Sequence, residues 1–419
     1  MPGQEYGSAQ PRVPPGEAAA PRYGSLRSLT DRPVAGGLIA LLAALAFVLA
    51  RLQIWAQGSI GRFILVGQHF ATPAQLPRGI PVAPAYGYDG QFFYRLALDP
   101  LNFRLTAYGI TMDRPYRFMR IGYPAVTWLV SLGQHTVVPI VLVAVNIAAV
   151  GAMGWLGGVF ARQAGRHALA GLLVPAYFGL ITSLARDTAE PLAAACLLGG
   201  LLAVRARRPV LAALLLAYGA LTRETVMAAV AAIAAVRVFG VLAGRRQALP
   251  GRDDLPWLVP TLAFTAWQVV VRAVTGSSTV LADSGRNAGT PFLGPFEALK
   301  SNLAHFSAQQ FTQVDLWFLE LAVLVAFAAA ALAGLRSTTA PPHECLALIL
   351  FLVEICVVTP STWHSLDSDL RSFIEVYLLA VIILLGMPLR TIWTTLLPYL
   401  AGFALPALIV VTQRRLVGS

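Results

Sequence analysis

The sequence predicts an all-α fold, a polytopic transmembrane helical bundle of about eleven spans with one long polar segment after the first span. Of the 419 residues, 57% are hydrophobic and 12% are charged, whereas soluble domains carry roughly 25% charged residues. The mean hydropathy is +0.67. Long apolar runs recur along the chain, and roughly 20 such residues cross a bilayer core as a helix.

The first apolar run extends from about residue 34 to residue 56. A Pro-, Gly- and Ala-rich stretch precedes it and no small-residue cleavage site follows it, so an uncleaved span is predicted rather than a signal peptide. Residues 1–32 are predicted to be a disordered cytoplasmic tail. The membrane domain is then expected to extend over residues 33–412, and residues 413–419 form a second tail.

The other predicted spans are apolar runs separated by short polar loops. They lie near residues 137–160, 168–186, 190–206, 209–222, 225–243, 256–275, 315–335, 344–360, 373–388 and 392–412. Residues 57–136 are expected to be a first extracytoplasmic loop with interfacial helices, and residues 276–314 a second large outer loop.

Arginine-rich short loops predict the orientation, because cytoplasmic loops of membrane proteins carry an excess of Lys and Arg. Alternate loops contain Arg162 and Arg166; Arg205, Arg207 and Arg208; Arg237, Arg245, Arg246 and Arg252; Arg336; and Arg390. We assign these loops to the cytoplasm, and the remaining loops to the outside. The bias also explains part of the net charge of +11, so nucleic acid is not an expected partner.

Charged and polar groups, which are costly in hydrocarbon, gather on the predicted outer face. They comprise Asp89 in the first loop, "RDTAEP" (186–191), "TRET" (222–225), the 276–314 loop and "HSLDSDLR" (364–371). Random scatter would divide them between both faces. Their convergence predicts a functional site at one membrane face.

The first-loop stretch "YGYDGQFFYRLALDP" (86–100) contains the first of these groups. Gly87 and Gly90 bracket Tyr88 and Asp89, which predicts a turn that enters a short helix with Asp89 near its N-terminus. The aromatic and apolar residues that follow fit an interfacial helix. Asp89 is either a plain helix N-cap or a functional carboxylate at the water–lipid boundary.

The stretch "RFMRIGYPAVTW" (117–128) ends the first loop and is predicted to be another interfacial element. Arginines such as Arg120 at an outer headgroup surface suit phosphate, because guanidinium forms bidentate hydrogen bonds with it. Ordinary anchoring to lipid headgroups is the alternative.

In "SLARDTAEPLA" (183–193), Asp187 and Glu190 are three residues apart, so a helical turn would place both carboxylates on one face. Arg186 and Glu190 are four residues apart and can pair. The functional interpretation is a site carboxylate held by an arginine. A self-satisfied salt-bridge cluster is the alternative.

Two further motifs fall on the same face. "LTRETV" (221–226) predicts a broken or very tight helical hairpin, in which the pair Arg223-Glu224 could bind Asp187 or Glu190. "STWHSLDSDLRSF" (361–373) crowds His364 and Arg371 with two aspartates into one loop. A single histidine is more often a surface residue than a ligand, and no HExxH or comparable metal motif occurs.

These motifs resemble the GT-C superfamily of polytopic glycosyltransferases, which take sugars from polyprenyl-phosphate donors. "YDGQFFY" looks like the first-loop acidic motif of such enzymes, including mannosyltransferases in which it begins with an aromatic residue followed by Asp-Gly. "RDTAEP" and "LTRE" are similar to motifs of bacterial membrane proteins grouped with them. The topology resembles the family over nearly the whole chain, the residues only over these motifs. The adjacent Asp-Glu pair of the protein mannosyltransferases is missing from the sequence.

The resemblance implies an inverting transfer with Asp89 as the base that accepts the acceptor proton. Further catalytic carboxylates would be Asp187, Glu190 and Glu224. The donor phosphate would be bound by Arg95, Arg120, Arg186, Arg223 and Arg371. The substrate would be lined by Tyr88, Gln91, Tyr94, Tyr123 and His364. No cofactor follows from the sequence, although Mg²⁺ or Mn²⁺ would suit oxygen-only ligands.

The expected partners are a polyprenyl-phosphate-linked sugar, a lipid, glycan or protein acceptor, and the bilayer. The expected location is a bacterial cytoplasmic membrane, with the active face outside. A transporter or lipid flippase is the alternative, because Glu320, Glu354 and Glu375 could lie within spans. A non-catalytic membrane scaffold is the third possibility.

Overall fold

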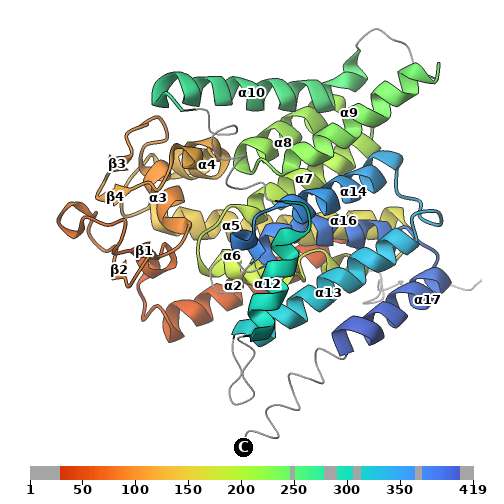
Figure 1. The fold of residues 1–419 in the computed structure, drawn as a ribbon, viewed down its shortest axis with the longest axis horizontal. Helices are drawn as coiled ribbons and strands as arrows, with labels where there is room; N and C mark the ends of the chain where they lie inside the picture. The colour runs from red at the N-terminus through yellow and green to blue at the C-terminus, as the bar shows by residue number, and fades with distance from the viewer. Residues whose placement is uncertain (1–28, 246–250, 278–289, 305–312, 364–369, 406–419) are drawn as a thin grey trace, which may run out of the picture.

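The computed structural model describes residues 29–245, 251–277, 290–304, 313–363 and 370–405. Most of the described residues are helical, and the longer helices lie largely side by side, with the first loop packed at one end of the bundle (Figure 1). The predicted helical class is therefore confirmed.

The longer helices coincide with most of the expected spans. They are α2 (Pro33–Ile54), α5 (Val138–Gln163), α7 (Glu190–Arg205), α8 (Pro209–Thr222), α9 (Val226–Leu242), α10 (Leu255–Thr275), α13 (Gln313–Ala333), α14 (Pro342–Val357), α16 (Ile374–Leu385) and α17 (Leu389–Tyr399), which continues as a π-helix, η7 (Leu400–Ala404). Many begin with proline in their first turn. The fixed φ of proline suits this position, where its missing N–H has no partner to lose.

Four helices are long and apolar enough to cross a membrane: Pro33–Ile54, Val138–Gln163, Arg252–Thr275 and Val314–Ala333. Six other expected spans form helices of 11 to 17 residues, which is shorter than the roughly 20 residues that a simple crossing needs. The expected number of about eleven spans stays a prediction.

One expected span is wrong. The apolar run 168–186 divides into a 3₁₀ helix, η4 (Ala168–Leu173), and the short helix α6 (Phe178–Ala185). Pro175 lies between them. Proline lacks an N–H and its ring clashes with the carbonyl group four residues earlier, which favours a helix break at this position.

Small residues allow α2 and α5 to pack closely against each other. A Cβ atom added at Gly154 would lie 2.6 Å from the Cβ of Ala40 and 2.6 Å from the carbonyl oxygen of Gly36. Side chains at these positions would force the helices apart, so the glycines allow the close approach that packs helices in membranes.

Helix α16 forms the centre of the bundle, because all of its residues are buried. Its sequence, IEVYLLAVIILL, is apolar on every side, as expected for a helix surrounded by others. Its one charged residue, Glu375, therefore requires a partner inside the protein.

The first loop is a compact unit rather than a set of surface helices. It contains η1 (Ile60–Phe63), β1 (Val66–Gly67), η2 (Pro73–Gln75), β2 (Val82–Ala83), α3 (Gly90–Leu98), β3 (Thr106–Ala107), β4 (Ile110–Thr111), η3 (Pro115–Met119) and α4 (Gly122–Ser131). Strands β1 and β2 pair in parallel, and β3 and β4 pair antiparallel.

Helix α3 is not the interfacial helix that the sequence predicted. All nine of its residues are buried, since aromatic and apolar side chains of the loop cover the face that was expected to meet lipid. Helix α4 differs, because Trp128, Leu129 and Val130 near its end are exposed. These side chains form the surface that an interfacial element would turn toward lipid.

Shorter elements complete the described fold. They are η5 (Arg252–Asp254), α12 (Leu293–Ala304), α15 (Pro360–Trp363) and η6 (Leu370–Phe373). Helix α12 occupies part of the expected second outer loop and crosses the long helices steeply in Figure 1.

Near its end, the predicted N-terminal tail is bound to the helical bundle. Asp31 accepts hydrogen bonds from Arg162 at 2.6 Å and from the backbone N–H of Ala168 at 3.0 Å. The prediction of disorder is therefore wrong for this residue, because the two bonds tie it to the bundle. The tails at 1–28 and 413–419 lie outside the described residues.

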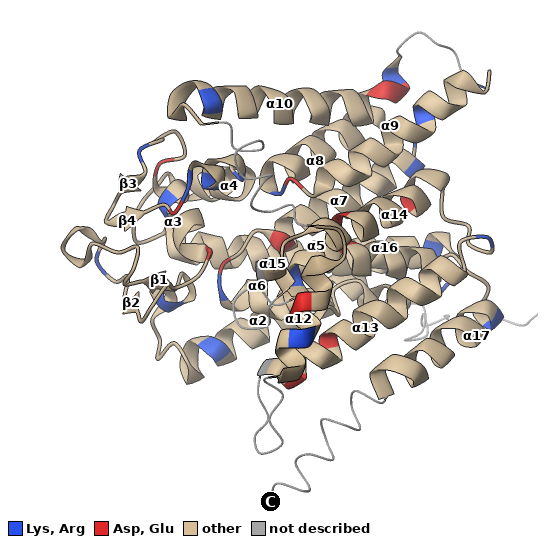
Figure 2. Ribbon diagram, viewed as in Figure 1, with Lys and Arg blue, Asp and Glu red and all other residues tan. Residues whose placement is uncertain are grey.

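Charged residues lie mainly toward the helix ends and in the first loop (Figure 2). At one end, Arg205 binds Glu344 with N–O distances of 2.6 and 2.5 Å, and Arg166 donates to the carbonyl oxygen of Leu385 at 3.4 Å. These helix ends all belong to loops that the sequence assigned to one side. The structure thus places together the ends that the arginine pattern grouped.

Candidate functional site

Asp89 lies at the N-terminus of α3, where the sequence predicted it, but it does not cap the helix. Its carboxylate accepts a hydrogen bond from Arg371 at 2.7 Å and pairs with Arg117 at 2.9 Å. The N-cap interpretation is therefore wrong, because both oxygens are directed to guanidinium groups from other segments.

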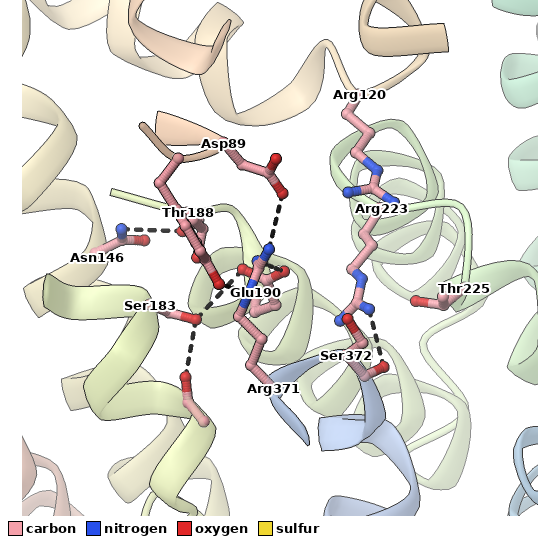
Figure 3. A network of polar contacts seen from close by, with 12 residues as sticks. Asp89, Arg120, Asn146, Ser183, Thr188, Glu190, Arg223, Thr225, Arg371 and Ser372 are labelled. Atoms are coloured by element: carbon pink, nitrogen blue, oxygen red, sulfur yellow. Dashed lines mark hydrogen bonds and ion pairs between the residues drawn. The ribbon is translucent and has the colours of Figure 1, made fainter. Parts of the chain in front are cut away.

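Arg371, in η6, joins three segments of the chain. Its Nε donates to the hydroxyl of Tyr88 at 2.7 Å, and its two terminal nitrogens donate to Glu190 and Asp89. Figure 3 shows the guanidinium between these two carboxylates. We call Tyr88, Asp89, Arg117, Glu190 and Arg371 the Asp89 cluster.

Gly90 explains why the aspartate is followed by glycine. A Cβ atom at Gly90 would lie 2.4 Å from the carbonyl oxygen of Arg186 and 2.9 Å from that of Ile64. Any larger residue would push the start of α3 away from the turn between α6 and α7. The glycine thus brings Asp89 within reach of the cluster that includes Glu190.

Glu190, in the first turn of α7, is 3% exposed and lies between two donors. Arg371 donates to one oxygen, and Ser183 lies 3.3 Å from the other. The sequence spacing had predicted that Glu190 pairs with Arg186. The guanidinium of Arg186 stacks on the ring of Tyr88, 4.2 Å from its centroid.

A second charged group, which we call the Glu224 cluster, adjoins the first. Arg120 donates to both oxygens of Glu224, at 2.8 and 2.6 Å, and Tyr116 donates to the same carboxylate. Arg117 and Arg120 are three residues apart, in η3 and directly after it. One short segment therefore supplies a cation to each cluster.

Gly122 allows this second group to form. A Cβ atom there would lie 2.2 Å from the hydroxyl oxygen of Thr222 at the end of α8. Because the backbones touch at this point, Arg120 lies directly beside the turn that carries Glu224. The tight hairpin predicted for "LTRETV" is confirmed, since only three residues separate α8 from α9.

Arg223 faces a different partner from those that the sequence suggested. It pairs with Glu375 of α16 at 3.2 Å and donates to the carbonyl oxygen of Ser372 at 2.9 Å. Thr225 donates to Glu375 at 2.5 Å. Arg223 and Glu375 are each 4% exposed, so this ion pair satisfies the one charge on the central helix.

The arginines hold the carboxylates in their charged forms. Burial by itself would raise the pKa of Asp89, but Arg117, Arg371 and Arg120 more than offset it and hold the pKa well below its ordinary value. Burial would also raise the pKa of Glu224, yet Arg120 and Tyr116 lower it to about 2. Both groups are therefore ionised near neutral pH.

Asp187 is separated from these clusters. It is fully buried, and neither of its oxygens has a hydrogen-bond partner among the described residues. Burial raises its pKa well above the ordinary value, and Arg51 offsets this only in part.

The predicted helical turn from Asp187 to Glu190 is wrong. Asp187 has a φ of 49°, a left-handed conformation, and α7 begins only at Glu190. The two carboxylates consequently do not share a helix face.

Several predicted site residues lie elsewhere. Arg95 is buried in the first loop and donates to the carbonyl oxygens of Asn102 and Arg104. Tyr94 is buried in the same core. The hydroxyl of Tyr123 donates to the carbonyl oxygen of Leu142 at 2.8 Å.

Gln91 has a structural contact as well. Its side chain accepts from the N–H of Gly67 and donates to the carbonyl oxygen of Tyr86, each at 3.0 Å. His364 lies outside the described residues. The structure thus brings together Tyr88, Asp89, Glu190 and Arg371, and, next to them, Arg120 and Glu224.

The sequence interpretation missed Arg117, Tyr116 and Glu375 as partners. Arg117 begins the motif in which only Arg120 was singled out, and the three-residue spacing of the two arginines was the available signal. Glu375 stood out as a charge in an apolar run. Its pairing with Arg223, 152 residues away, had no local signal.

The described residues do not fit a divalent metal ion. No group of three or more His, Cys, Asp or Glu side chains within them could hold one. The carboxylates of Asp89, Glu190 and Glu224 accept from guanidinium groups, which occupy oxygens that Mg²⁺ or Mn²⁺ would need.

Comparisons with known proteins add no relative. No protein-family model matches the chain, and no curated protein matches it. The functional proposal therefore depends on the geometry of the two clusters and on the motif resemblance.

Proposed function

We propose that this protein is an integral-membrane glycosyltransferase of the GT-C type, which moves a sugar from a polyprenyl-phosphate donor to an acceptor. The proposed location is the outer side of a bacterial cytoplasmic membrane. The observation that carries the proposal is Asp89, an ionised carboxylate that is 21% exposed and lies between Arg117 and Arg371. A carboxylate beside cations, close to apolar helices, suits transfer from a lipid phosphate.

In the proposed reaction, an acceptor hydroxyl attacks the anomeric carbon and Asp89 takes the hydroxyl proton. The new carbon–oxygen bond forms as the bond between the anomeric carbon and the phosphate oxygen breaks. The lipid phosphate leaves with the bonding electron pair, and guanidinium groups stabilise its negative charge.

The arginines differ in how far they can take part. Arg371 is 6% exposed and has three protein partners, so it holds the cluster together. Arg117 is 19% exposed and pairs with Asp89 and Asp113, and Arg120 is 15% exposed and binds Glu224 and Tyr116. We assign the donor phosphate to Arg117 and Arg120 because they are more exposed than Arg371.

This assignment explains how a carboxylate with a lowered pKa can act as a base. A phosphate bound at Arg117 and Arg120 adds negative charge close to Asp89 and so weakens the effect of these two arginines on its pKa. The pKa of Asp89 then rises toward the working pH, where general bases are most effective.

The test is a transfer assay in membranes with a polyprenyl-phosphate sugar and candidate acceptors. Asp89→Asn keeps the size of the side chain and removes the base, so transfer should fall by about 10² or more. Asp253→Asn, at an exposed aspartate near the opposite end of the bundle, should leave transfer unchanged. Wild-type rates in Asp89→Asn, at equal protein abundance, would show that Asp89 is not the base.

A transporter is the second candidate. The observation that favours it is Glu320, a buried residue inside the candidate span Val314–Ala333, because ionisable groups within spans often mark ion or substrate pathways. Uptake into proteoliposomes that requires Glu320 but not Asp89 would favour the transporter over the enzyme.

A further inference from the structure

Three aromatic side chains form a patch on the first loop. The ring centroids of His69 and Tyr86 are 4.6 Å apart, and those of His69 and Phe70 are 5.0 Å apart. Tyr86 is 64% exposed, and His69 is also exposed. We call these three residues the aromatic patch.

The backbone beneath the aromatic patch is held by several bonds. Strands β1 and β2 pair directly beside it, and the N–H of His69 donates to the carbonyl oxygen of Ala85 at 3.1 Å. The amide of Gln91 bridges Gly67 and Tyr86 from the buried side. Because its supports are fixed, the patch offers a preorganised surface, which lowers the entropic cost of binding.

The aromatic patch lies close to the Asp89 cluster, to which the buried side chain of Phe92 connects it. Phe70 contacts the ring of Phe92 at 5.4 Å between centroids, and the guanidinium of Arg117 lies 4.4 Å from the centroid of Phe92. Tyr86 precedes Asp89 by only three residues. Three residues of extended chain span at most about 11 Å, so a ligand of a few sugar units can reach both places.

We propose that the aromatic patch binds a sugar ring of the acceptor, so that the acceptor is an oligosaccharide or a longer glycan. The inference rests on the proposed function, because it names the acceptor of the same site. One face of a pyranose ring carries C–H bonds that pack against an aromatic ring. The hydroxyl of Tyr86 and the imidazole of His69 add hydrogen-bonding groups at the edge of that surface.

The polar surroundings favour a sugar over a lipid chain. Gln68 precedes the patch and Thr72 follows it in the sequence, and both are exposed. An acyl chain needs continuous apolar surface, whereas a glycan offers alternating apolar faces and hydroxyl groups.

Direct binding tests the patch without any transfer reaction. Linear trisaccharides of glucose, mannose and galactose are added to the full-length protein in lipid nanodiscs, and saturation-transfer NMR measures contact with each sugar. Wild-type protein should saturate at least one trisaccharide. Tyr86→Ala should reduce that signal about threefold or more, since an aromatic contact contributes about 1 kcal/mol.

Two further variants serve as comparisons. Tyr86→Phe keeps the ring and should retain most of the signal. Trp393→Ala removes an exposed aromatic residue of α17 and should leave it unchanged. Absence of saturation for every trisaccharide, or equal signals from wild type and Tyr86→Ala, would overturn the inference. A full signal in Tyr86→Leu, which keeps apolar contact without the ring, would overturn it as well.

The transfer assay separates this inference from the proposed function. With trisaccharide and methyl-monosaccharide acceptors compared, Tyr86→Ala should lower the ratio of their kcat/KM values about fivefold, whereas Trp393→Ala should not change it. Binding at Tyr86 without transfer by wild type would refute the glycosyltransferase and support the sugar-binding patch. Transfer with an unchanged ratio would support the enzyme and refute the patch.

Discussion

At the scale of single residues, position relative to arginine decides the charge of each carboxylate. Asp89 is held ionised by two guanidinium groups. Burial instead raises the pKa of Asp187, in the turn just before the helix of Glu190, because its oxygens accept no hydrogen bond from the described residues and Arg51 offsets the burial only in part. Both aspartates stood in conspicuous polar motifs. The difference between them depends on partners more than 25 residues away in sequence.

Acid should weaken the protein through Glu224. Its pKa falls from an ordinary 4.5 to about 2 on folding, so the ion pair with Arg120 contributes its full stability above about pH 4.5. That contribution is lost as the pH falls toward 2, where the folded carboxylate is also protonated. Unfolding of detergent-solubilised protein between pH 6 and pH 2 should therefore be less pH-dependent in Arg120→Gln than in wild type.

Arg78→Gln provides the matched control, because Arg78 is an exposed arginine of the same loop. It should follow the wild-type pH profile. Parallel profiles for wild type and Arg120→Gln would contradict the assignment of the lowered pKa to this ion pair.

At the scale of elements, close contacts between backbones determine which polar residues meet. The start of α3 touches the turn before α7 at Gly90, and the start of α4 touches the end of α8 at Gly122. These two contacts bring the first loop to the carboxylates of the bundle. The loop thus supplies both the proposed base and the proposed phosphate-binding arginines.

Helices α2 and α5 provide a test of packing at this scale. In Gly154→Val the added atoms would meet Ala40 and the backbone of Gly36, which lie 2.6 Å from the position of the new Cβ. We expect a loss of about 1–3 kcal/mol in stability through overpacking. Thermal unfolding in detergent measures it.

Gly402→Ala is the control, because nothing lies within 4 Å of a Cβ atom at that position. It should not destabilise the protein, because alanine favours a helix over glycine and meets no neighbour here. Equal unfolding temperatures for Gly154→Val and wild type would show that α2 and α5 do not pack as described.

At the scale of the whole molecule, the helix ends form two groups. One group contains the Asp89 and Glu224 clusters, and the other contains pairs such as Arg205 with Glu344. The long helices between them carry few charges (Figure 2). This division is what a protein that crosses a membrane requires, since charges in the hydrocarbon are costly.

Orientation can be tested with single cysteines after Cys196, Cys345 and Cys356 have been replaced. Ala74 lies exposed in the first loop, and Arg208 lies exposed between α7 and α8. If the first loop faces outward, a membrane-impermeant maleimide added to intact cells should label Ala74→Cys and spare Arg208→Cys. Permeabilised cells, in which both should react, control for reactivity. If only Arg208→Cys were labelled in intact cells, the orientation would be the opposite of the one predicted.

The sequence by itself determined the helical class, the places of most long helices and the tight turn at Arg223–Thr225. Composition and local patterns carry this information, because an apolar run must form a helix in lipid and proline ends or starts it. The sequence also indicated that Asp89, Glu190, Glu224 and Arg371 belong to one face.

Only the tertiary structure decided which of these residues meet. Arg371 binds Asp89 from 282 residues away, and Arg120 binds Glu224 from 104 residues away. Such pairs depend on how loops and helices approach one another, which no local pattern records. The same packing buried α3, moved Arg95 and Tyr94 into the core of the first loop, and isolated Asp187 from Glu190. Charge placement followed from the cost of polar groups in lipid, whereas charge pairing followed from the fold.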